Sequence, residues 1–333
     1  MLRRNLLAAV GATGLNSLMF SSSYAQTKWQ MAIGAPETNY LGKIVREFVD
    51  DIAASSNNEL QIQLHPRASL LAQPHIMRGV RTNQIQLGKT LLALHGNEDP
   101  FFELEGIPFL ADTWEDTIAL QTAAEPFIRQ RLESRGLTLL FSIPWTGQGF
   151  YTNSPVTKVS DLKDTRLRIY NPVTSRMATL AGARPVNIVA GEIPQAFASG
   201  IINAMFTSAQ TGVDFNAWDF TKIFTEVGGM RNRAVVIANT AALNSLPVNT
   251  RTAILEASKK ANENGFVEAR KIEVTSLQAL RSKGIQTPTP TAELMRGLRD
   301  IGTQLAGEWI ARTGQEGSAL MARYRELQGN RAR

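Results

Sequence analysis

The stretch DLKDTRLRIYNP, residues 161–172, places two arginines two positions apart in a strand-like run. Because successive side chains of a strand alternate between its faces, Arg166, Arg168 and Tyr170 would share one face and the apolar residues between them the other. On a solvated outer face these guanidinium groups would be ordinary surface charges. A guanidinium that faces a cleft would instead bind an anion, and its planar fork suits a carboxylate. The stretch alone leaves both interpretations open.

Residues that could carry catalysis form no recognisable constellation in this sequence. Cysteine is absent, which excludes a thiolate nucleophile, a disulfide framework and cysteine-based metal centres. The run GKT at residues 88–90 ends like a phosphate-binding loop, but Asn83 stands where that motif needs its first glycine. The three histidines are not at metal-ligand spacing, and no serine-hydrolase, zinc-protease or dinucleotide fingerprint occurs. The sequence therefore predicts a binding protein with no metal site and no cofactor.

The first 25 residues have the pattern of a secretory signal peptide. Arg3 and Arg4 precede a largely apolar stretch, residues 6–20, and the small-residue pattern at 23–25 suits cleavage before Gln26. This pattern predicts export to the periplasm and leaves the Sec and twin-arginine routes both open. A permanent membrane anchor is the weaker alternative, because glycine and polar residues interrupt the apolar stretch.

Composition describes the remainder of the chain as globular. The full sequence of 333 residues is 43% hydrophobic and 19% charged, which suits two domains of ordinary size. The formal net charge is +6, but basic and acidic residues are interleaved and no basic block contains aromatic residues. A nucleic-acid partner is therefore not expected.

Short strands alternate with amphipathic helices through most of the chain after residue 26. Strands are expected at residues 29–34, 60–66, 84–90 and 137–145, and a helix between Thr113 and Gly136, with Asp116 in its first turn. The alternation begins again after residue 147, and from about residue 245 onward the pattern is almost entirely helical. This order predicts two α/β domains with mainly parallel sheets, joined by strands, with a helical C-terminus packed across both.

Residues 159–208, which include the arginine stretch, resemble the signature region of the solute-binding proteins of TRAP transporters, the DctP-type family. That region has an Asp-Leu-Lys turn, a strand with an arginine, a Gly-Ala-x-Pro segment and an Ala-Leu-x-x-Gly segment. Residues 161–163, 167–168, 182–185 and 196–200 stand in these places here. The run PFL at 108–110 also resembles a family segment, and the resemblance covers nearly all of the chain after the signal peptide.

The resemblance implies a two-domain periplasmic-binding-protein-like fold with hinge strands. Its implied division is a signal peptide at 1–25, domain I at 26–147 plus about 234–273, and domain II at 148–233 plus about 274–333. It also implies a monomeric, non-enzymatic receptor that captures a small organic acid by domain closure and delivers it to the small and large membrane permease subunits. A secreted enzyme acting on carboxylic acids and a periplasmic ligand-sensing protein are the alternatives.

Within this family the strand arginine holds the ligand carboxylate, and that role falls on Arg168. Three departures from the family pattern stand out: Gln148 replaces a frequent second arginine, Thr207 replaces a frequent ligand-binding asparagine, and an acidic position near the third strand is apolar in the run GKTLLAL. With one strong anchor, a buried second carboxylate would lack a partner, so a monocarboxylate is favoured. The expected ligand is a 2-oxo or 2-hydroxy acid with an apolar or aromatic tail.

Other candidate ligand contacts follow from position and residue type. Lys89 is expected just past the carboxyl end of a strand, where α/β clefts bind, and as a second cation it would favour a dicarboxylate instead. Asn171 could orient an oxygen next to the carboxylate. Three aromatic residues could line an apolar pocket or belong to the core; they are Trp145, Phe206 and Trp218.

Overall fold

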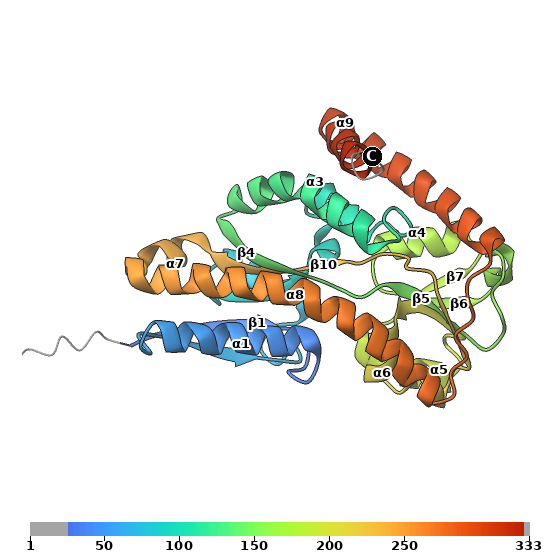
Figure 1. The fold of residues 1–333 in the computed structure, drawn as a ribbon, viewed down its shortest axis with the longest axis horizontal. Helices are drawn as coiled ribbons and strands as arrows, with labels where there is room; N and C mark the ends of the chain where they lie inside the picture. Colours follow the sequence, from blue (N-terminus) through green and yellow to red (C-terminus); the bar gives the residue numbers. More distant parts are fainter. Residues whose placement is uncertain (1–25, 330–333) are drawn as a thin grey trace, which may run out of the picture.

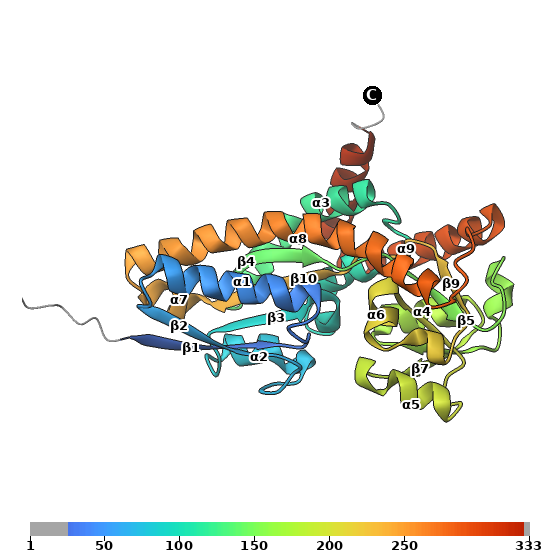
Figure 2. The same ribbon diagram turned by 60° about the horizontal axis from the view of Figure 1, so that its bottom comes forward.

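The computed structural model describes residues 26–329, so the predicted signal peptide lies outside the described residues. Two five-stranded sheets organise the chain (Figures 1 and 2). The first has the order β2-β1-β3-β10-β4 and contains β1 (Thr27–Ile33), β2 (Leu60–His65), β3 (Leu87–Leu91), β4 (Leu137–Pro144) and β10 (Arg233–Asn239). The second has the order β7-β6-β8-β5-β9 and contains β5 (Gln148–Thr152), β6 (Arg166–Ile169), β7 (Arg184–Asn187), β8 (Ala204–Ser208) and β9 (Ile223–Glu226).

Both sheets are mixed, which corrects the expectation of mainly parallel sheets. In the first, β1 is parallel to β2 and β3, whereas β10 is antiparallel to β3 and β4. In the second, β6 is parallel to β7 and β8, whereas β5 is antiparallel to β8 and β9. The antiparallel strands β5 and β10 each enter from the other sheet, so no βαβ crossover dictates their direction.

Helices cover both faces of the sheets. They are α1 (Tyr40–Ser55), α2 (Ile76–Arg81), α3 (Trp114–Glu133), α4 (Pro172–Leu180), α5 (Ile193–Ala198), α6 (Ala209–Asp214), α7 (Thr240–Ser245), α8 (Val248–Ser282) and α9 (Ala292–Gly329). Short 3₁₀ helices lie between them at η1 (Gln73–His75), η2 (Leu92–His95), η3 (Pro100–Gly106), η4 (Val159–Leu162), η5 (Ala190–Glu192) and η6 (Ala217–Asp219). The α/β fold class and the helical C-terminus are thus confirmed.

Local sequence signals set several helix ends. Thr113 caps α3, because its hydroxyl accepts a hydrogen bond from the Asp116 backbone N–H at 3.0 Å. After α3 the chain turns at Gly136 with φ of +71°, a conformation that glycine adopts without strain. Both signals were predicted, and both are confirmed.

One hydrophobic core runs through both sheets. It joins residues of η3, α2 and α3 on the first sheet to strands β5, β6 and β8 and helix α4 on the second, and α9 contributes from outside. The opposite face of the first sheet packs under α1, α7 and α8, and that of the second under α5 and α6. Figure 1 shows α9 lying across α3 and α4, so the C-terminal helix packs against both halves as predicted.

Three segments pass from one sheet to the other. Residues 145–147 connect β4 to β5, residues 227–232 connect β9 to β10, and α8 packs against α1 and β4 before reaching α6. The first two lie side by side, since the Trp145 N–H donates to the Asn232 carbonyl at 2.8 Å and the Gly229 N–H to the Gln148 carbonyl at 2.9 Å. We call residues 145–147 and 227–232 the crossover segments. The domain boundaries that the sequence resemblance implies remain a prediction.

None of the helices in residues 26–329 has the length and apolar character that crossing a membrane requires.

Candidate functional site

Arg168 is a buried cation without a carboxylate partner. It lies on β6 with 4% of its surface exposed, and it takes part in no ion pair within residues 26–329. Its Nε donates to the Ile188 carbonyl at 2.9 Å, and its guanidinium carbon lies 4.8 Å from the centre of the Tyr170 ring. Burial lowers the pKa of Arg168 to about 10. Arg166, two residues earlier, is exposed and donates to the Gly200 carbonyl.

Beside this arginine, the Tyr170 hydroxyl joins three parts of the chain. It donates to Gln148 Oε1 at 2.9 Å and accepts from Asn232 Nδ2 at 2.9 Å. Burial raises the pKa of Tyr170 to about 12, so the phenol stays neutral at physiological pH. Gln148, a predicted ligand residue, is therefore buried close to Arg168.

Tyr170 and Asn232 were not among the ligand-binding candidates predicted from the sequence. For Tyr170 a signal existed, since it follows Arg168 by two residues on the same predicted face. For Asn232 there was none, because 62 residues separate it from Tyr170.

Two further predicted residues of the second sheet carry polar groups into the buried region. Asn171 caps α4, with its Oδ1 accepting from the Thr174 N–H at 2.8 Å, while its Nδ2 is buried and has no partner within residues 26–329. Thr207 lies in β8 with 4% exposure, opposite Gly149 of β5. Asn232 Oδ1 is likewise buried without a partner in the described chain. Such groups are normally completed by a ligand or by ordered water.

Lys89 lies within the first sheet. It is the third residue of β3, paired with Ile33 and Val236, and not past the end of the strand as expected. The strand continues to Leu91 because β10 pairs along its full length. Its side chain is 2% exposed and makes no hydrogen bond or ion pair within residues 26–329, and burial lowers its pKa to about 8.

Of the three aromatic candidates, Trp145 lies in a crossover segment and the other two belong to hydrophobic cores. Trp145 Nε1 donates to Ser208 Oγ at 2.9 Å. Phe206 is fully buried and packs 4.9 Å from Phe150, ring centre to ring centre, on the face of the sheet that carries Leu167. Since Arg168 points to the opposite face, Phe206 is a core residue rather than a wall of its pocket.

Trp218 packs in the smaller core beneath α5 and α6, and Lys283 Nζ lies 5.4 Å from its ring centre. No contact joins Trp218 to Arg168 among the contacts of the described residues.

A charged cluster fastens the crossover segments to α8. The Glu273 carboxylate accepts from Arg231 Nη2 at 2.7 Å, from the Gly147 N–H and from Trp114 Nε1 at 3.0 Å. Arg231 and Gly147 belong to different crossover segments, and Glu273 belongs to α8. All three connections between the sheets are therefore linked by one carboxylate.

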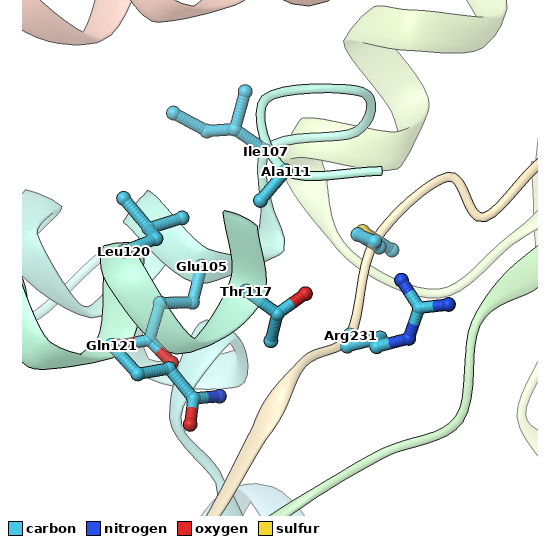
Figure 3. A pocket seen from close by; sticks show the side chains of 8 residues that line it. Glu105, Ile107, Ala111, Thr117, Leu120, Gln121 and Arg231 are labelled. Carbon is cyan, nitrogen blue, oxygen red and sulfur yellow. The ribbon is translucent and has the colours of Figure 1, made fainter. Parts of the chain in front are cut away.

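Two hollows of the molecule lie away from Arg168. Figure 3 shows the side chains that line a cavity between α3 and the second crossover segment. Its volume is about 10 Å³, which holds one water molecule at most. A groove of about 750 Å³ lies between α3 and α8 over β4. Neither is lined by a predicted ligand residue, so the candidate site rests on the buried charge and its polar neighbours.

Known proteins resemble this chain over nearly its whole length. Residues 31–310 match the family model described as bacterial extracellular solute-binding protein, family 7 (DctP). The structure of DctP7 of Bordetella pertussis, described as an extracytoplasmic solute receptor binding pyroglutamic acid, is 37% identical with a TM-score of 0.87, over 90% of this chain and 99% of that chain. DctP6 of the same organism, described in the same words, is 35% identical with a TM-score of 0.88, over 90% and 100%.

A curated relative is more distant. The ectoine/5-hydroxyectoine-binding periplasmic protein UehA of Ruegeria pomeroyi is 22% identical over 320 residues, which cover 94% of each chain.

Proposed function

Because this chain belongs to the DctP family of bacterial extracellular solute-binding proteins, the receptors of TRAP transporters, we propose that its ligand is a small monocarboxylic acid of the pyroglutamate class. The chain is a receptor and not an enzyme, as its family and its structural neighbours are. It binds the acid in the periplasm, after removal of residues 1–25, and closes its two halves around it. It then delivers the acid to the membrane permease subunits.

The buried, unpaired guanidinium of Arg168 is the observation that carries this proposal. An isolated charge removed from water is costly unless a partner of opposite sign compensates it. Since no acidic side chain within residues 26–329 pairs with Arg168, the partner would come from outside the chain. A carboxylate fits the guanidinium best, because two parallel N–H···O bonds form at once.

The groups around the anchor favour a neutral remainder of the ligand. Gln148, Tyr170 and Asn232 are uncharged and occupy the space near Arg168. The unpartnered Asn171 Nδ2 is a donor and the unpartnered Asn232 Oδ1 is an acceptor, which suits a ligand with one C=O and one N–H. Pyroglutamate has both in its lactam ring, and the two relatives at 35% and 37% identity are described as binding it.

Lys89 does not require a second carboxylate. Its pKa of about 8 lies close to neutral pH, so discharging it costs only about 1.4 kcal/mol per pH unit. Its ammonium group has three N–H donors, and these can also bind a neutral carbonyl. Lys89 in the first sheet would thus be a second donor, besides Arg168 in the second sheet, for a ligand with a neutral carbonyl.

A thermal-shift screen tests the proposal. The protein is unfolded and refolded to remove any bound acid, then heated with pyroglutamate, 2-oxo and 2-hydroxy acids, aromatic acids, dicarboxylates and uronic acids. A ligand at about 100 times its dissociation constant adds about 2.7 kcal/mol of stability. We expect pyroglutamate to give the largest rise in melting temperature. A rise with dicarboxylates or uronic acids alone would refute the monocarboxylate assignment.

A further inference from the structure

Tyr170 connects the anchor of the second sheet to both crossover segments. Its ring lies against the guanidinium of Arg168, at 4.8 Å from ring centre to guanidinium carbon. Its hydroxyl binds Gln148, the first residue after one crossover segment, and Asn232, the last residue of the other. A single phenol therefore touches the candidate ligand anchor and both strands about which the two halves would turn.

Relative motion of the two sheets would have to be absorbed in the segments that connect them, which are the two crossover segments and α8. Hinge motion concentrates in a few residues at element ends, and both crossover segments run between the end of one strand and the start of the next. Figures 1 and 2 show them as the thin links between the sheet of β10 and the sheet of β5. The amide groups that Tyr170 binds lie at the ends of these links that adjoin β5 and β10.

We propose that Tyr170 is a positioning residue that couples occupation of Arg168 to closure of the hinge. This inference rests on the proposed function in one respect, since it takes Arg168 as the ligand anchor. A carboxylate bound to Arg168 orders the guanidinium and, through it, the stacked ring. The ordered hydroxyl then holds Gln148 and Asn232 together, which fixes the two crossover segments relative to each other.

The hydroxyl suits this task because it donates and accepts at once. The hydroxyl donates to Gln148 Oε1 at 2.9 Å, and it accepts from Gln148 Nε2 at 2.7 Å and from Asn232 Nδ2 at 2.9 Å. The raised pKa of Tyr170 means that the proton stays in place over the physiological pH range. Phenylalanine at this position would keep the ring on the guanidinium and lose these hydrogen bonds.

A second buried tyrosine of the same sheet provides a matched control. Tyr151 on β5 is fully buried, and its hydroxyl donates to the Ser208 carbonyl at 3.1 Å. That bond joins β5 to the end of β8, and neither of its two atoms belongs to Arg168 or to a crossover segment. Tyr151→Phe therefore removes a similar group from a similar depth without affecting the proposed coupling.

The test compares Tyr170→Phe with Tyr151→Phe in two measurements. Calorimetry with pyroglutamate gives affinity. The distance between the halves is measured with spin labels on two introduced cysteines, Gln61→Cys in the first sheet and Ser154→Cys after β5. Both positions are exposed, and the chain has no other cysteine. We expect Tyr170→Phe to weaken binding about tenfold, or about 1.4 kcal/mol, and to broaden the distance distribution of the ligand-free protein. Tyr151→Phe should lower the melting temperature and leave affinity and distances unchanged.

The outcomes separate this inference from the proposed function. If Tyr170→Phe binds and closes like the wild type, or behaves like Tyr151→Phe, the coupling is refuted while the receptor function stands. If the wild type binds no organic acid, the proposed function fails, and the ligand-free distance distributions still decide whether Tyr170 restrains the hinge. Gln148→Met, which removes one of the two partners, should shift both measurements in the same direction by a smaller amount, and keeps the test open should Tyr170→Phe fold poorly.

Discussion

Arg168 in the second sheet and Arg233 in the first lie in strands at almost the same depth, with 4% and 2% of their surfaces exposed. Their surroundings differ. Arg233 donates to Glu105 Oε2 at 2.8 Å, to the Gln121 carbonyl at 2.8 Å and to Glu125. Within residues 26–329, the side chain of Arg168 makes one hydrogen bond, to the Ile188 carbonyl, and lies against the Tyr170 ring.

The pKa values of the two groups express this difference. For Arg233, burial lowers the pKa, but Glu105 and Glu125 more than offset it, so the pKa lies above its ordinary value. For Arg168, burial acts without a carboxylate to oppose it, so the pKa falls. Burial depth alone therefore does not distinguish an arginine that is paired within the chain from one that is open to an external anion. What distinguishes them is whether the chain supplies the opposite charge.

The largest expected effect comes from breaking the paired cluster. Arg233→Met leaves Glu105 buried beside no cation, and removing one partner of a buried pair typically costs about 3–5 kcal/mol. Urea unfolding should show this loss as a lower midpoint. In the double variant with Glu105→Gln, part of the lost stability should be recovered. If Arg233→Met alone lost less than about 1 kcal/mol, the ion pair would not distinguish Arg233 from Arg168 in its contribution to stability.

Arg168→Lys should have the opposite profile, with the ligand-free fold kept and binding impaired. Lysine keeps the charge and loses the bidentate fork, and changes at buried charged contacts cost about 2–5 kcal/mol of binding free energy. Calorimetry with the best ligand of the screen measures the loss. Affinity close to the wild type in Arg168→Ala would contradict the anchor assignment.

A smaller effect, on stability, is expected at Lys89, a second buried cation without an ion-pair partner within residues 26–329. Because burial of its charge is uncompensated within the described chain, Lys89→Met should stabilise the ligand-free protein at pH 7 by about 1–3 kcal/mol. The urea midpoint measures this gain. An unchanged or lower midpoint would mean that the ammonium group is compensated in solution.

The titration of Lys89 should make the free energy of unfolding depend on pH in a definite direction. Its pKa is about 8 in the native state and 10.5 ordinarily, so between these values the unfolded chain binds more protons. Stability should therefore increase as the pH rises through this window and fall as the pH drops toward 8. Unfolding free energies measured across the window should show this contribution in the wild type and not in Lys89→Met; identical slopes would place the lysine pKa near its ordinary value.

The smallest effect is expected at Arg166, the exposed neighbour of the anchor. Arg166→Gln removes a solvated charge two residues from Arg168, and exposed charges contribute little. Ligand affinity should stay within about twofold of the wild type. A loss of affinity as large as that of Arg168→Lys would contradict the assignment of ligand binding to Arg168 alone.

Much of the fold could be read from local patterns, because the signals lie within a few residues of one another. The alternation of strands and helices predicted the α/β class, and Thr113 with Asp116 predicted the start of α3. Strand direction was harder. The antiparallel entry of β5 and β10 depends on chain segments that return from the other sheet, and no local pattern records that route.

For the site, the sequence by itself determined that Arg168 lies between apolar neighbours and that the surrounding motif resembles a receptor family. Only the tertiary structure decided which buried charges are paired and which are not. Arg233 and Glu105 are 128 residues apart, and Tyr170 and Asn232 are 62 apart. Because electrostatic compensation depends on distance in space, the sequence near an arginine cannot show whether a carboxylate reaches it from a remote element. That is why the roles of Arg233 and Asn232 could be recognised only from the packed structure, in which remote strands and helices bring their partners close.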